Sequence, residues 1–147
     1  MKKIILEKYK LINLGLLLAL LALLAYMNTN YENWFKGPEA LDFYKYYYAI
    51  YNPVFVSVTW LSGILAAFII LPSKLFRIWL FYIAPAFLLL TYFLVKGISV
   101  YSTNLLNPTR GQMAENGMFV LAVVTAVYVV GKLIYDWKKN GLKNKFK

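Results

Sequence analysis

Residues Leu11–Met27 read LINLGLLLALLALLAYM, a run that contains nine leucines, one isoleucine and no charged side chain. A helix of roughly 20 predominantly apolar residues crosses a hydrocarbon core about 30 Å thick. Because this core holds no water, a continuous apolar run favours a helix, which satisfies its backbone hydrogen bonds internally. The run exceeds the about 7–15 apolar residues of a cleaved signal peptide. It therefore predicts a permanent transmembrane helix.

Three further runs, at residues 47–71, 78–95 and 118–135, are also almost continuously apolar. Strands of a membrane barrel would instead alternate apolar and polar side chains. The whole chain is 61% hydrophobic and 15% charged, whereas about 25% of the residues in a soluble domain are charged. The sequence therefore predicts an all-α integral membrane protein, a four-transmembrane-helix bundle that forms a single domain over residues 1–147.

Lysine and arginine residues are unequally divided between the two ends of the predicted helices. One end has 12 of the 16, namely Lys2, Lys3, Lys8, Lys10, Lys74, Arg77, Lys132, Lys138, Lys139, Lys143, Lys145 and Lys147. The other end has Lys36, Lys45, Lys96 and Arg110. Because the cytoplasmic side retains the excess of basic residues, both termini are predicted to be cytoplasmic. The bias is typical of a protein of a prokaryotic cytoplasmic (inner) membrane.

Two segments are predicted to lie at the membrane surface. The basic cytoplasmic tail, residues 136–147, is expected to contact anionic lipid through Lys138, Lys139, Lys143 and Lys145, since each lysine near such a leaflet contributes about 1 kcal/mol. The outer segment, residues 28–46, is rich in aromatic rings, which favour the headgroup level when one edge is polar. An interfacial belt that contacts lipid or a partner subunit is expected from Trp34, Tyr44, Tyr46, Tyr47, Tyr48 and Tyr51.

Small residues recur four positions apart, the spacing that lets two membrane helices approach closely. These helix-packing pairs are Gly15 with Ala19, Ser62 with Ala66, Gly63 with Ala67, and Ala122 with Ala126. Hydroxyl groups on the same helices are expected to form hydrogen bonds either between helices or back to their own helix. The residues that carry them are Ser57, Thr59, Ser62 and Thr125.

Prolines predict two helix kinks and one turn. Pro53 lies near the outer end of the second predicted helix and Pro85 lies in the middle of the third. Each removes a backbone hydrogen bond and bends the helix. Residues 107–111, with the sequence NPTRG, form a turn by composition. Residues 113–116 are expected to lead into the fourth helix.

The composition excludes several kinds of chemistry. The chain has no cysteine and no histidine, which excludes thiolate chemistry and the ligation of haem or iron–sulfur clusters by these residues. The interiors of the predicted helices hold no ionisable side chain of the kind that marks proton relays and transport pathways. The net charge of +10 is gathered at helix ends, so nucleic acid is not an expected partner. No cofactor is expected on this chain alone, apart from lipids.

One stretch resembles a known family. The residues concerned are Pro38-Glu39, Asp42, Phe55, Val58-Thr59-Trp60 and Ile64-Leu65. They look like the second membrane helix of the C subunit of copper-dependent ammonia and methane monooxygenases, over less than half of this chain. That subunit holds copper with aspartate and histidine, and the absence of histidine here means that no copper ligand is carried over. The resemblance implies a chain that supplies membrane helices to such a complex without its metal site.

Two functional hypotheses follow from the sequence. The first is a non-catalytic accessory or structural subunit of a larger membrane protein complex, which the resemblance would make a membrane monooxygenase. Its expected partners are other membrane subunits, and the isolated chain is expected to have no enzymatic turnover. The alternative is a homo-oligomeric pore for small solutes, or a membrane sensor. In a pore, the hydroxyls of Ser57, Thr59 and Ser62 would face the axis.

Overall fold

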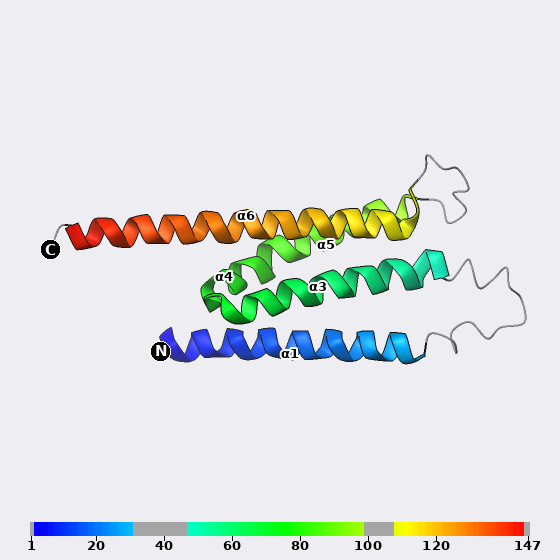
Figure 1. Cartoon of the computed structure of the whole chain (residues 1–147), viewed down its shortest axis with the longest axis horizontal. Coiled ribbons are helices and arrows are strands. Elements are labelled where there is room, and N and C mark those ends of the chain that lie inside the picture. The colour runs from blue at the N-terminus through cyan, green and yellow to red at the C-terminus, as the bar shows by residue number, and fades with distance from the viewer. Residues whose placement is uncertain (1, 31–46, 99–107, 146–147) are drawn as a thin grey trace, which may run out of the picture.

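The computed structural model describes residues 2–30, 47–98 and 108–145, and it describes the side chains of residues 8–30, 47, 49–98 and 108–139. Within these ranges the chain is helical and contains no strand (Figure 1). In chain order the elements are α1 (Lys2–Thr29), the π-helical turn η2 (Tyr47–Tyr51), α3 (Asn52–Ile70), α4 (Ser73–Ile78), the π-helical turn η3 (Trp79–Ile83), α5 (Ala84–Lys96) and α6 (Arg110–Lys145).

Among the described residues, four helical segments are long and apolar enough to cross a membrane. They are Lys8–Thr29, Ala49–Ile70, Ser73–Lys96 and Arg110–Lys139. The prediction of an all-helical chain with four such helices is therefore confirmed. The first, third and fourth helices are longer than their apolar runs, because lysine, arginine, glutamine and methionine are good helix formers and continue a helix past its apolar part.

Both termini lie at the same end of the molecule, together with the turn that joins α3 to α4 (Figure 1). We call this the terminal end, and we call the opposite end, where α5 ends and α6 begins, the loop end. An even number of crossings produces this arrangement, which agrees with the predicted topology. The cytoplasmic location of the termini stays a prediction from the charge bias.

The helices pack in a row in the order α1, α3, α6 and α5. α1 contacts α3 and α4, α3 contacts α6, and α6 contacts α5. α4 and η3 fill the centre of the row at the terminal end. Direct contacts between α3 and α5 are few.

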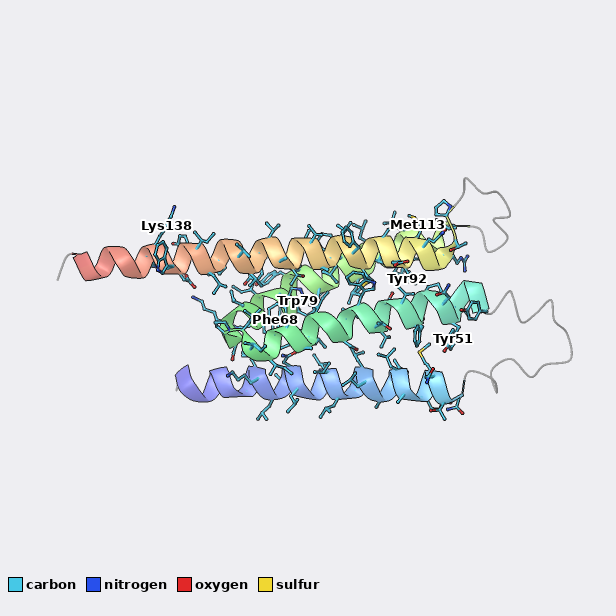
Figure 2. The ribbon with its side chains drawn as sticks, in the orientation of Figure 1. Tyr51, Phe68, Trp79, Tyr92, Met113 and Lys138 are labelled. Atoms are coloured by element: carbon cyan, nitrogen blue, oxygen red, sulfur yellow. The ribbon has the colours of Figure 1, made fainter. Side chains whose placement is uncertain are left out.

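The core at the terminal end is aromatic. Phe68, Phe76 and Trp79 are each no more than 2% exposed. Their ring centroids lie 5.6 Å apart for Phe68 and Phe76, 5.1 Å for Phe68 and Trp79, and 6.1 Å for Phe76 and Trp79. Figure 2 shows Phe68 and Trp79 in the interior of the bundle, whereas Lys138 projects away from α6. Because such rings interlock tightly, this cluster holds α3 against the helix that follows it.

Hydrogen bonds attach α1 to α3 and to η2, one toward each end of the contact. The Asn13 side-chain amide donates to the Leu65 carbonyl at 3.1 Å, in a buried setting. At the loop end, the Tyr51 hydroxyl donates to the Met27 carbonyl at 3.3 Å. The Asn13 Oδ1 atom is also buried, and it accepts no hydrogen bond from the residues that the structure describes. α1 is thus held at two separated points of an otherwise apolar contact.

Each of the two prolines that the sequence marked as kinks follows a π-helical turn. Pro53 comes two residues after η2, and Pro85 comes two residues after η3. A proline ring collides with the carbonyl four residues earlier, which here belongs to Ala49 or Phe81. Both of these residues lie inside the π-helical turns. Because a π-helical turn is wider than an α-helical one, it makes room for the ring and lets the helix continue.

Candidate functional site

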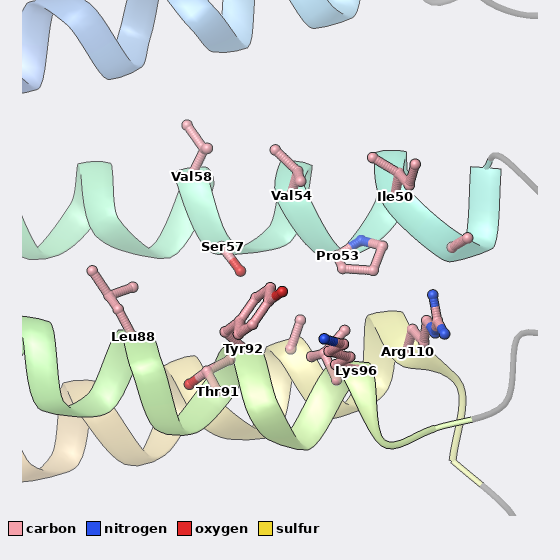
Figure 3. A pocket seen from close by; sticks show the side chains of 13 residues that line it. Ile50, Pro53, Val54, Ser57, Val58, Leu88, Thr91, Tyr92, Lys96 and Arg110 are labelled. Carbon is pink, nitrogen blue, oxygen red and sulfur yellow. The ribbon is translucent and has the colours of Figure 1, made fainter.

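A lateral groove opens between α3 and α5 near the loop end, with a volume of about 460 Å³. We call it the loop-end groove. Its walls are mostly apolar side chains of η2, α3 and α5, and Lys96 and Arg110 lie at its loop end (Figure 3). The lining residues are Ala49, Ile50, Pro53, Val54, Ser57, Val58, Leu88, Thr91, Tyr92, Val95, Lys96, Arg110 and Ala114.

Two glycines of α6 create this groove by drawing α3 and α5 onto the same helix. A Cβ atom added to Gly111 would lie 2.5 Å from the Asn52 Nδ2 atom of α3. A Cβ atom added to Gly117 would lie 2.5 Å from the Thr91 Oγ1 atom of α5. At Gly117 the added atom would also lie 3.1 Å from the Thr91 Cβ atom, so a larger residue there would push α5 away from α6. At Gly111 the Asn52 side chain would have to move. α3 and α5 therefore both sit close to α6, and the space between them stays open.

Both cations of the loop-end groove lack an ion pair with the residues that the structure describes. Lys96 is exposed, and its Nζ atom lies 5.9 Å from the centroid of the Tyr92 ring. Arg110 is half-buried, and its Nε–H donates to the Ile98 carbonyl at 2.9 Å. The groove thus combines an apolar interior with positive charge at one end, which no described acidic residue pairs with.

A second groove lies between α3 and α6, closer to the terminal end, with a volume of about 570 Å³. We call it the small-residue groove, because four of the predicted small residues form its walls. Gly63 and Ala67 line the α3 side, and Ala122 and Ala126 line the α6 side. A Cβ atom added to Gly63 would meet nothing within 4 Å. Toward the loop end, Trp60 and Phe119 meet edge to face with ring centroids 6.2 Å apart.

Three of the other predicted helix-packing residues are exposed in the part of the chain that the structure describes. Gly15 and Ala19 are exposed on α1, Ala66 is exposed on α3, and a Cβ atom on Gly15 would meet nothing within 4 Å. Ser62 is buried, and its hydroxyl donates to the Val58 carbonyl of its own helix at 2.8 Å. The exposed small residues consequently remain predicted contacts for another chain.

The start of α6 corrects the turn that composition suggested for residues 107–111. Arg110 and Gly111 already belong to the helix. The Gln112 N–H donates to the Thr109 hydroxyl at 3.2 Å, and the Thr109 N–H donates to Gln112 Oε1 at 2.9 Å. These reciprocal bonds form a capping box, which has the signature Thr-x-x-Gln in the sequence. Reading that signature would have placed the helix start correctly.

The hydroxyl groups of α3 do not share one face. Ser57 lines the loop-end groove, whereas Thr59 lines the small-residue groove. The Thr59 hydroxyl donates to the Phe55 carbonyl of its own helix at 2.8 Å. Ser62 is buried and also bonds to its own helix. Within this chain the three hydroxyls therefore do not form a continuous polar line.

The structure describes only some residues of the predicted aromatic belt. Tyr47 and Tyr51 stack with ring centroids 5.6 Å apart, and Tyr51 stacks on Phe55 at 5.9 Å. Tyr51 is 7% exposed and packs against α1, so it acts as a core residue of this chain. Lys138 and Lys139 are exposed, as contact with anionic lipid requires. Outside the described residues lie Trp34, Tyr44 and Tyr46, together with the side chains of Tyr48, Lys143 and Lys145.

The described side chains contain no cluster of three or more histidine, cysteine, aspartate or glutamate residues that would hold a metal ion. Comparisons with protein-family models, with curated proteins and with solved structures find no match to this chain. The resemblance to the copper monooxygenase subunit therefore stays a prediction. The functional argument rests on the two grooves.

Proposed function

We propose that this chain is a non-catalytic accessory subunit of a larger membrane protein complex, and that a transmembrane helix of a partner subunit packs into the small-residue groove. The observation that carries this proposal is the opposed pair of small-residue walls. Gly63 and Ala67 stand on one side and Ala122 and Ala126 on the other. Small residues four apart let a third helix backbone approach closely.

Packing explains why a helix suits this groove. Between membrane helices the hydrophobic effect contributes little, because lipid tails are as apolar as the side chains. Association then depends on close contact over many atoms, each contact adding about 0.1–0.2 kcal/mol. A groove with small residues on both walls and no charged lining residue offers such contact to a rigid helix. The partner is expected to be a different membrane subunit, and a membrane monooxygenase is the parent complex that the sequence resemblance suggests.

The pore hypothesis receives no support from the arrangement of hydroxyls. A pore lined by α3 would need Ser57 and Thr59 to face the same axis, but they line different grooves. The small-residue groove could instead join copies of this chain, and the test below distinguishes this outcome from a heteromeric complex.

The test compares the same substitution at two open glycines. Gly63→Leu fills the small-residue groove, and Gly15→Leu adds the same bulk to the outer face of α1. Neither position has an atom within 4 Å of the added Cβ, so both variants are expected to fold. Native mass spectrometry of gently extracted complexes should show larger subunits with the wild-type chain and with Gly15→Leu, and their loss with Gly63→Leu. Particles that contain only copies of this chain would contradict the heteromeric proposal.

The chain has no cysteine, which permits a second, positional test. A single cysteine at Ala126 should form a disulfide with a cysteine on the partner helix, or react with a short crosslinker, within the intact complex. A single cysteine at Val127 is the matched control, because it is exposed on α6 but does not line the groove. Equal crosslinking from both positions would show that the groove is not the site of contact with the partner.

A further inference from the structure

We propose that the loop-end groove binds an anionic phospholipid of the leaflet at that end, with the phosphate between Lys96 and Arg110 and one acyl chain along the groove. This proposal is independent of the accessory-subunit proposal, because the two grooves share no lining residue. It assigns a ligand class to a site that none of the described helices fills.

The two cations come from different helices, and both lie toward the loop end of the groove. Lys96 is the last residue of α5, and Arg110 is the first residue of α6 (Figure 3). The bond from Arg110 Nε to the Ile98 carbonyl fixes the guanidinium in place. Its two Nη groups remain for a ligand, since no described residue accepts a hydrogen bond from them. Planar guanidinium donors match the geometry of phosphate oxygens.

The rest of the groove suits hydrocarbon. Behind the cations, its walls are formed by side chains such as Val54, Val58, Leu88 and Val95. The volume of about 460 Å³ falls in the range of roughly 300–1,000 Å³ typical of small-molecule sites. Figure 3 shows Tyr92 of α5 pointing across the groove toward Ser57 of α3. The groove is open to the side, so a lipid enters from the bilayer without leaving it.

Charge complementarity favours an anionic headgroup over a zwitterionic one. Of the acidic side chains that the structure describes, Glu115 and Asp136, neither lines the groove. A phosphate carried by a lipid brings negative charge and an acyl chain together, which matches both parts of the groove. A zwitterionic lipid offers the same chain but adds a positive group beside two cations. The groove should therefore prefer phosphatidylglycerol to phosphatidylcholine.

Native mass spectrometry of the purified chain tests this preference with the two lipids at identical acyl-chain composition. Phosphatidylglycerol should be retained about tenfold more strongly than phosphatidylcholine. The double variant Lys96→Gln/Arg110→Gln should abolish that preference. Val54→Trp, which fills the apolar part, should lower the retention of both lipids while both cations remain. Ser57→Leu is a second filling variant, to be used if Val54→Trp lowers the thermal unfolding midpoint.

The matched control is Lys74→Gln/Lys138→Gln, which removes the same charge at the terminal end from two exposed side chains. This variant should keep the preference. If the control lost the preference for phosphatidylglycerol to the same extent, the preference would come from the general surface charge, and the proposal would be wrong. A second contradictory result would combine two observations. Inorganic phosphate would displace phosphatidylglycerol, and neither Val54→Trp nor Ser57→Leu would change lipid retention. The groove would then be a site for free anions, and the lipid proposal would be wrong.

Discussion

The indole N–H of Trp79 donates a hydrogen bond to the hydroxyl of Thr125 at 2.8 Å, in the buried contact between η3 and α6. The Thr125 hydroxyl in turn donates to the Leu121 carbonyl of its own helix at 2.7 Å. Trp79 is 2% exposed and Thr125 is 8% exposed. This relay satisfies the indole donor without water, which lets a tryptophan occupy the centre of an apolar core.

Replacing Thr125 with valine should destabilise the fold, because the indole N–H of Trp79 then has no acceptor. We expect a loss of about 1–2 kcal/mol in the free energy of unfolding, measured by denaturant titration in mixed micelles. Thr59→Val is the matched control, since the Thr59 hydroxyl bonds only to the Phe55 carbonyl of its own helix. The two variants should differ clearly, and equal losses would mean that the Trp79 bond contributes nothing measurable.

Asn13→Leu should leave stability nearly unchanged, although it removes a buried hydrogen bond between helices. The bond to the Leu65 carbonyl contributes about 0.6 kcal/mol by comparison with other membrane helices. Its loss is offset because the unsatisfied Oδ1 atom also disappears. Asn13→Ala should be less stable than Asn13→Leu, because it leaves a void between α1 and α3. A loss above about 2 kcal/mol for Asn13→Leu in the same titration would mean that Oδ1 has a partner in the membrane.

Gly117→Ala should cost about 1–3 kcal/mol, because the added methyl group collides with Thr91 and separates α5 from α6. Gly131→Ala in the same helix is the control, since a Cβ atom there meets nothing within 4 Å. It should raise stability by up to about 1 kcal/mol through helix propensity. A double variant, Gly117→Ala with Thr91→Ala, should recover much of the loss in a double-mutant cycle. Simple additivity of the two changes would argue against the contact.

Thr109→Ala should weaken the first turn of α6, because it removes the side-chain acceptor of the capping box. The expected cost is about 1 kcal/mol. Amide hydrogen exchange at Gln112 and Met113 should accelerate by about fivefold, whereas Thr109→Ser should retain protection. Since Arg110 directly follows the cap, the same variant should also reduce the preference for phosphatidylglycerol. Unchanged exchange in Thr109→Ala would show that Pro108 and tertiary contacts hold the helix start without the cap.

Local sequence was sufficient to predict the four membrane-spanning segments and their helical structure. A long apolar run in lipid must bond its own backbone, so composition over about 20 residues determines a helix whatever surrounds it. The start of α6 was also present in local sequence, as the capping signature from Thr109 to Gln112. The turn composition of residues 107–111 favours a later helix start, which this signature corrects.

The partners of individual side chains were decided by tertiary structure. Small residues at Gly63 and Ala126 show that a backbone is able to approach, but the spacing carries no information on which helix does so. Gly111 and Gly117 make the close contacts of this chain and have no partner at the four-residue spacing. Their role depends on where Asn52 and Thr91 lie in space.

Thr125 shows, within one residue, what the local sequence determines and what the tertiary structure decides. Its sequence allowed a bond to its own helix or to another helix, since a hydroxyl both donates and accepts. In the structure it makes both bonds, because the fold brings the Trp79 indole to its acceptor side. The apolar runs by themselves determined four helices, since backbone hydrogen bonding in lipid is a local requirement. The two grooves and their cations depend on how those helices pack, which only long-range contacts decide.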